Sequence, residues 1–228
     1  VREIPGFLAF TAVFVLMFIR EQKFMLLALG ALTLGTAITG FFPSLFGLLL
    51  TTLLMSTGFH YFETLKQSLS LQWLSKDEAP EMLGKFISVG ALASLITYGA
   101  LWVCLEVFQM DFKWVYLTFG GIGFLLVVWM AFAFPQFQTR VQQNKKLVLR
   151  KRYWLYYALT FMSGARRQIF TVFAGFLMVE KFGYSAADIT MLFLINYLFN
   201  FLFAKRIGKF IGKVGERKAL LFEYTGLI

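Results

Sequence analysis

Two groups of polar side chains interrupt long apolar stretches of this chain. His60, Glu63 and Gln67 follow one another at spacings of three and four residues, which places them on one face of a helix. The adjacent Arg166 and Arg167 lie near the middle of the apolar stretch 153–179. An ionisable group in hydrocarbon costs at least ~2.5 kcal/mol on insertion scales. Each group therefore indicates a cavity or a partner.

The chemistry open to these residues is proton exchange and anion binding. His60 or Glu63 could exchange a proton, because burial and neighbouring charges tune such groups. Lys66, three residues after Glu63, could pair with it. One arginine could bind an anionic or hydroxyl-rich group through its fork of donors. Adjacent helix positions differ by about 100°, so the other arginine would pair with an acid or with carbonyls. In the alternative interpretation, all these residues form interhelical salt bridges that only fix the packing.

Asn196 and Asn200, four residues apart, could extend the same polar site or form interhelical hydrogen bonds. The lone Cys104 excludes a disulfide framework, and one histidine with few acids makes a metal site improbable, so no metal is expected. Close helix approach is expected at a set of glycines: 30, 35, 40, 90 and 99.

The composition indicates what medium surrounds these residues. Of 228 residues, 59% are hydrophobic and only 15% charged, with 29 Phe, which excludes a soluble globule. Continuous apolar runs predict helices rather than alternating barrel strands. We expect an all-α polytopic membrane protein, and we suspect a fragment because the chain starts at Val1. Eight apolar segments are expected, the first and last incomplete: 6–19, 24–41, 45–66 with a more polar continuation to 74, 86–107, 114–134, 153–179, 189–204 and one opening at 219.

The basic residues fall on one membrane side when the breaks between segments are assigned alternately. Sixteen lysines and arginines lie on the side of 20–23, against Lys113 and Lys181 on the other. This partition excludes nucleic-acid binding as the reason for the net charge of +10 and favours anionic lipid as the partner. The sixteen are Arg20, Lys23, Lys76, Lys85, Arg140, Lys145, Lys146, Arg150, Lys151, Arg152, Lys205, Arg206, Lys209, Lys213, Arg217 and Lys218.

The stretch 208–218, Gly-Lys-Phe-Ile-Gly-Lys-Val-Gly-Glu-Arg-Lys, resembles the Gly-x-x-x-Asp-Arg-x-Gly-Arg-Arg/Lys loop of the major facilitator superfamily. Gly212 replaces the family's Asp, and the first-half copy at 19–23 keeps only its charged end. The resemblance implies a helix bundle with an incomplete two-half architecture, from about the second helix to the start of the ninth. It implies a gating loop with the residues Gly208, Gly212, Lys213, Gly215, Arg217 and Lys218.

The resemblance also implies a domain organisation and a function. Residues 1–135 would form the N-terminal half bundle, 136–152 a basic cytoplasmic linker, and 153–228 the start of the C-terminal half. We expect a monomeric secondary transporter of a small solute, proton-coupled and working by alternating access, in the plasma (bacterial inner) membrane. The substrate could be anionic. Efflux of amphipathic compounds and a non-transporting sensor or scaffold are the alternatives. No His-Glu-x-x-His or nucleophile motif indicates an enzyme, and no cofactor is expected.

Overall fold

The computed structural model describes residues 4–135, 137, 150–169, 173–184 and 186–226, and within these ranges it contains helices and turns and no strand. A short 3₁₀ turn at Lys151–Tyr153 precedes α7. The helices are α1 (Ile4–Phe7), α2 (Ala12–Val15), α3 (Glu21–Thr39), α4 (Leu45–Trp73), α5 (Ala79–Trp102), α6 (Phe112–Ala133), α7 (Trp154–Ile169), α8 (Gly175–Glu180), α9 (Ala186–Val214) and α10 (Glu216–Thr225).

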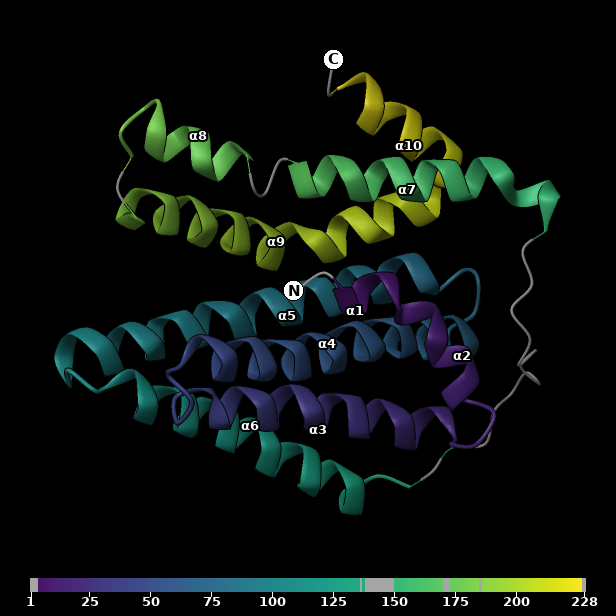
Figure 1. Cartoon of the computed structure of the whole chain (residues 1–228). Coiled ribbons are helices and arrows are strands. Elements are labelled where there is room, and N and C mark those ends of the chain that lie inside the picture. Colours follow the sequence, from purple (N-terminus) through teal and green to yellow (C-terminus); the bar gives the residue numbers. More distant parts are fainter. Residues whose placement is uncertain (1–3, 136, 138–149, 170–172, 185, 227–228) are drawn as a thin grey trace.

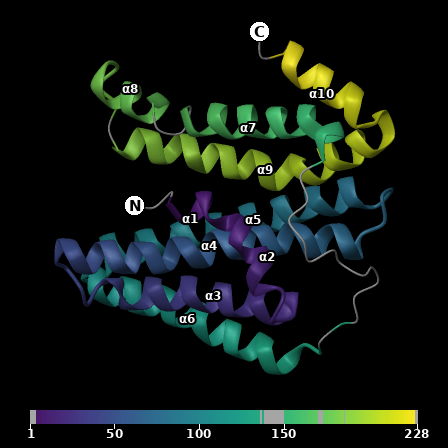
Figure 2. The same ribbon diagram turned by 45° about the vertical axis from the view of Figure 1, so that its right-hand side comes forward.

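The helices form two groups in space. Helices α1 to α6 make one group, with α3 packed between α4 and α6, and α7 to α10 lie together on the other side of α5 (Figure 1). The turned view keeps this arrangement and places α9 along α5 (Figure 2). Helix α5 is therefore the element of the first group that contacts the second.

Glycines allow the close packing around α3. A methyl group on Gly58 of α4 would lie 2.5 Å from the Ala28 carbonyl oxygen and 2.5 Å from the Leu32 amide nitrogen. A methyl group on Gly120 of α6 would overlap the backbone of Ala37. Gly35 and Gly40 also lie close to other segments of the chain, as expected. A methyl group at position 90 or 99, by contrast, would meet no described heavy atom within 4 Å. The expectation of close approach was wrong at those two positions, because their side of α5 has no partner in the described chain.

Local signals explain where several helices begin. The Ser44 hydroxyl accepts a hydrogen bond from the Gly47 amide at 3.1 Å, which caps the start of α4. Pro80 lies in the first turn of α5, where its missing N–H costs nothing. Helix α5 therefore begins at Ala79 rather than at residue 86, and a π-helical turn, Val103–Val107, follows it.

The expected first span, 6–19, is broken. Helix α1 ends at Phe7, a 3₁₀ turn follows at Ala9–Thr11, and α2 ends at Val15. The Thr11 hydroxyl donates to the Leu8 carbonyl at 2.5 Å and lies 2.7 Å from the Tyr61 hydroxyl. These side-chain bonds satisfy the backbone locally and tie the segment to α4.

The expected loop after residue 204 is also wrong. Helix α9 continues to Val214, so Gly208, Gly212 and Lys213 are helical. The break comes at Gly215, whose φ of 90° lies in the region that favours glycine. The stretch 153–179 contains α7 and α8, and residues 170–172 between them lie outside the described structure.

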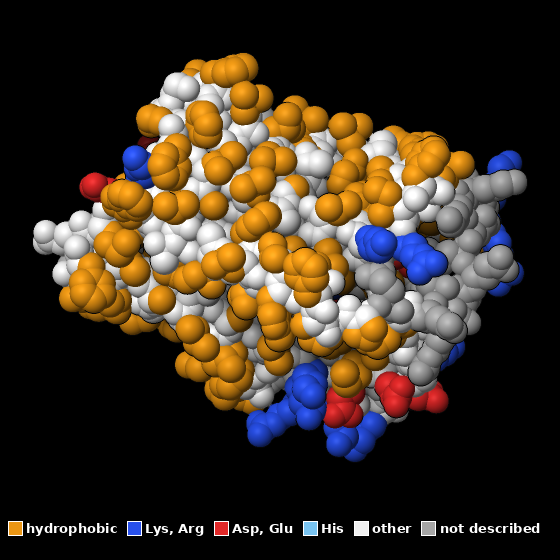
Figure 3. Space-filling view, turned by 90° about the horizontal axis from the view of Figure 1, so that it is seen from below, with side chains coloured by type: hydrophobic (Ala, Val, Ile, Leu, Met, Phe, Trp, Pro, Cys, Tyr) orange, Lys and Arg blue, Asp and Glu red, His pale blue; other side chains and the backbone are white. Residues whose placement is uncertain are grey.

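In the part of the chain that the structure describes, five helical segments are long and apolar enough to cross a membrane: Glu21–Thr39, Leu45–Trp73, Ala79–Leu105, Phe112–Ala133 and Met191–Val214. Their outer surfaces carry large apolar side chains, for example Phe132, which is 87% exposed. Figure 3 shows such side chains spread over the face below α3 and α6, with charged side chains toward its margins. This surface fits an apolar solvent rather than water.

Candidate functional site

A polar stripe runs along α4 on the side turned away from α3. We define this stripe as Ser56, His60, Glu63 and Gln67, which recur at spacings of four, three and four residues. Gly58, where an added methyl group would meet the α3 backbone, lies about 200° around the helix from both Ser56 and His60. His60 is the sixteenth of the 29 residues of α4, so the stripe crosses the middle of the helix.

Glu63 and Lys66 form an ion pair within α4, as their spacing predicted. The Lys66 Nζ donates to Glu63 Oε1 at 2.5 Å, and the two side chains are 41% (Glu63) and 46% (Lys66) exposed. The Lys66 ammonium also lies 5.6 Å from the centre of the Phe62 ring. The pair carries no net charge. His60 is the other ionisable side chain of the stripe.

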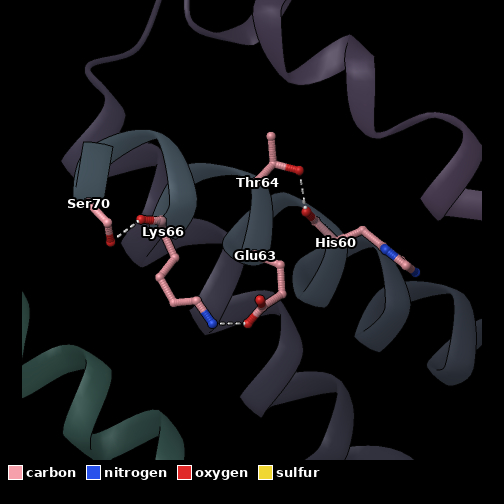
Figure 4. A network of polar contacts seen from close by, with 5 residues as sticks. All are labelled: His60, Glu63, Thr64, Lys66 and Ser70. Atoms are coloured by element: carbon pink, nitrogen blue, oxygen red, sulfur yellow. Dashed lines mark hydrogen bonds and ion pairs between the residues drawn. The ribbon is translucent and has the colours of Figure 1, made fainter. Parts of the chain in front are cut away.

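His60 and Glu63 lie on the same side of α4, but their side chains point apart (Figure 4). The imidazole extends along the helix away from the ion pair and rests against Gly6 of α1. The Phe59 ring lies 5.3 Å from the imidazole centre at an interplanar angle of 77°. The described residues provide no hydrogen-bond partner for either ring nitrogen of His60, which leaves both nitrogens open to a proton, water or solute.

Asn196 and Asn200 pair with each other along α9. The Asn200 amide nitrogen donates to the Asn196 side-chain oxygen at 2.9 Å. The bond lies within one helix, unlike the interhelical bond that the sequence allowed. Asn196 is exposed and Asn200 half-buried. This bond uses one of the four amide N–H donors of the pair, which leaves three N–H donors and acceptor capacity for another polar group.

Arg166 and Arg167 lie in α7, one turn from its end at Ile169. Their side chains lie outside the described part of the structure. Gln67 of the stripe is exposed, which keeps it accessible to solute.

Helices α5 and α9 cross with their backbones in close contact. A methyl group on Gly84 would lie 2.5 Å from the Ala204 carbonyl oxygen, and one on Gly208 would overlap the Pro80 carbonyl. The Ser88 hydroxyl donates to the Phe201 carbonyl. The two helices are antiparallel, because residues near the start of α5 meet residues near the end of α9.

Polar and aromatic pairs flank this crossing. The Lys205 ammonium lies 3.7 Å from the Glu81 carboxylate, with both side chains well exposed. Farther along, the Tyr98 and Tyr197 rings lie 5.6 Å apart. The ion pair marks the basic end of the crossing and the tyrosines mark the other end. The crossing therefore runs along most of both helices.

The residues expected in a gating loop divide among three settings. Gly208 is buried in the crossing, and a methyl on Gly212 would lie 3.8 Å from Pro80 Cβ. Gly215 makes the turn between α9 and α10. The remaining three, Lys213, Arg217 and Lys218, are exposed.

Sequence reasoning missed two features of this region. Ser56 is 6% exposed and extends the α4 stripe by one turn, and its spacing of four from His60 could have identified it. The Glu81–Lys205 pair joins residues 124 positions apart, so no local pattern could predict it. Among the described residues, no three His, Cys, Asp or Glu side chains come together as metal ligands would.

Comparison with known proteins identifies the family of the chain. The chain matches the family profile of the Major Facilitator Superfamily over residues 4–228. No curated protein and no solved structure matches it significantly. The profile covers nearly the whole chain, including α4, α7 and the α5–α9 crossing. The chain therefore belongs to the Major Facilitator Superfamily and is an integral membrane protein of this family of transporters.

Proposed function

We propose that this protein is a secondary active transporter that moves a small solute by alternating access, coupled to protons. The observation that carries the proposal is the α4 stripe: a histidine with no hydrogen-bond partner among the described residues and a carboxylate lie halfway along an apolar helix, on the side turned away from α3. Ionisable groups at such depth are retained where water and solute reach them. His60 or Glu63 would carry the proton, and Gln67, Asn196 and Asn200 would contact the solute.

The proposed substrate is anionic. The Glu63–Lys66 pair carries no net charge, so the α4 stripe does not repel an anion. Arg166 or Arg167 would supply the binding charge, because a guanidinium matches carboxylate and phosphate geometry. Adjacent positions of an ideal helix differ by about 100°, so in this proposal one arginine serves the solute and the other serves packing.

The α5–α9 crossing supports the alternating-access part of the proposal. It joins 1–135 to 153–228, which we propose as two half bundles connected by the basic linker 136–152. The glycine contacts and the exposed Glu81–Lys205 pair make an interface that can separate and re-form with little loss of buried charge. We place the helix ends that carry basic residues, and the turn at Gly215 beside them, at the cytoplasmic face of the plasma membrane, against anionic lipid.

Efflux of amphipathic compounds is the second candidate. The Phe59 ring next to His60 is 43% exposed, and Lys66 lies over Phe62, so aromatic surface adjoins the polar stripe. An aromatic cation would favour such a surface. A screen with both ligand classes separates the two candidates.

The test begins with a thermal-shift screen of small carboxylates, phosphates, sugars and aromatic cations on the purified chain. The best ligand is then followed into proteoliposomes with and without a pH gradient. We expect an anion to stabilise the protein and its uptake to depend on the gradient. We also expect Arg166→Ala and Arg167→Ala to differ strongly in uptake at equal protein level. Equal losses that only follow expression would show a structural role for both arginines.

A further inference from the structure

The imidazole of His60 rests against the backbone of α1 at Gly6. A methyl group on residue 6 would lie 3.0 Å from His60 Cε1, 3.2 Å from Nε2 and 3.4 Å from Nδ1. Relaxed contacts between such atoms are about 3.5–4.0 Å. Any residue larger than glycine would therefore push the ring away from α1. The space that the ring occupies exists because position 6 has no side chain.

The segment that carries Gly6 is fixed to α4 next to His60. Tyr61, the neighbour of His60, shares a hydrogen bond with Thr11. One residue later, Ala12 is 2% exposed and packs in the same cluster as Leu65 of α4. These contacts hold α1 and α2 against α4, so Gly6 has a defined place relative to the imidazole. Residues 4–15 contain no ionisable side chain.

Gly6 differs from the glycines that pack helices together. The methyl group on Gly58 would meet the Ala28 carbonyl and the Leu32 amide, which belong to the backbone of α3. The three heavy atoms nearest to a methyl group on Gly6 all belong to the end of one rotatable side chain, His60. Substitution at Gly58 must therefore displace a helix, whereas substitution at Gly6 displaces the imidazole.

We propose that Gly6 is a positioning residue for His60. It leaves the space in which the imidazole lies between α1 and the Phe59 ring, and it thereby sets the direction from which a proton or solute reaches the ring nitrogens. The inference rests on the proposed role of His60 in transport. The test below measures the imidazole itself, so the inference about Gly6 can fail while the proposed role of His60 in transport still holds.

His60 is the only histidine in the chain, which makes the test specific. The full chain is purified with a tag that lacks histidine. The absorbance of N-carbethoxyhistidine, formed with diethylpyrocarbonate, and the imidazole C–H signals in an NMR spectrum then report on this ring alone. In Gly6→Ala we expect modification at least ~3-fold faster and shifted imidazole signals, because the ring leaves its rotamer and its place beside Phe59. Gly90→Ala is the matched control, since its methyl group meets no described heavy atom within 4 Å.

Thermal unfolding separates positioning from packing. We expect Gly6→Ala to melt within about 3 °C of wild type, and Gly58→Ala to melt clearly lower. Once His60→Ala has removed the ring, adding Gly6→Ala should change nothing further. The proposal is overturned if Gly6→Ala matches Gly90→Ala in both imidazole measurements, or if it lowers the melting temperature equally with and without His60. Loss of transport in His60→Ala is a separate result that tests the proposed function.

Discussion

A single methyl group at Gly84 should open the α5–α9 crossing. The added carbon would lie 2.5 Å from the Ala204 carbonyl oxygen. Because relaxed C···O contacts are about 3.3–3.6 Å, the helices must separate by roughly 1 Å. Overpacking of this kind costs about 1–3 kcal/mol. Alanine also has a higher helix propensity than glycine, but this favours the open and the closed crossing equally and does not change the ratio between them.

The magnitude follows from that cost. A bias of about 1–3 kcal/mol against the closed crossing shifts the ratio of closed to open molecules by roughly 5- to 150-fold. Ala91, on the same face of α5, is 4% exposed, so a cysteine placed there reports on opening. The native Cys104 is first replaced by serine.

The assay is the rate at which a membrane-impermeant maleimide labels Ala91→Cys in proteoliposomes. In Gly84→Ala we expect labelling to be at least ~5-fold faster than in the parent, with uptake reduced. Gly99→Ala, whose methyl group would meet no described heavy atom within 4 Å, should label like the parent. If a folded Gly84→Ala protein labels at the parental rate, the crossing does not open and the reasoning is wrong.

Three further predictions concern charge and packing. Glu63→Gln leaves the charge of Lys66 uncompensated, so at matched protein levels it should impair uptake more than the double variant Glu63→Gln with Lys66→Met. The melting temperature should change little, because exposed ion pairs contribute about 0–1 kcal/mol to stability. Gly58→Ala should lower stability by about 1–3 kcal/mol and Gly99→Ala should not, as measured by thermal unfolding. Lys113→Met removes an ammonium that lies 4.5 Å from the centre of the Phe41 ring. It should lower the free energy of unfolding by about 0.5–1 kcal/mol in the same assay. An unchanged melting temperature would show that the contact contributes nothing.

The sequence predicted the long helices well where polar breaks bound continuous apolar runs. The expected segment 24–41 became Glu21–Thr39, and 114–134 became Phe112–Ala133. These boundaries are local, since Pro43 and the polar residues 20–23 end or begin helices by their own chemistry. The Glu63–Lys66 pair was predictable for the same reason, because helical spacing alone brings the two side chains together.

Tertiary contacts explain the failures. Gly208 indicated a loop, but α9 continues through it because the missing side chain admits the Pro80 carbonyl. Gly90 indicated close packing, but a methyl group there would meet no heavy atom of the described chain within 4 Å, although its residue type is the same. The direction of the His60 ring depends on α1, 54 residues earlier, and no periodicity in α4 contains that information.

The most direct test of the account is proton movement at the α4 stripe. Proteoliposomes that contain the full chain and trapped pyranine are given the anion that stabilises it best in the thermal-shift screen. We predict that wild type acidifies or alkalinises the lumen as the anion enters, and that His60→Ala or Glu63→Gln abolishes this signal while the anion still binds. A full proton signal in both variants would contradict the claim that this stripe carries the coupling.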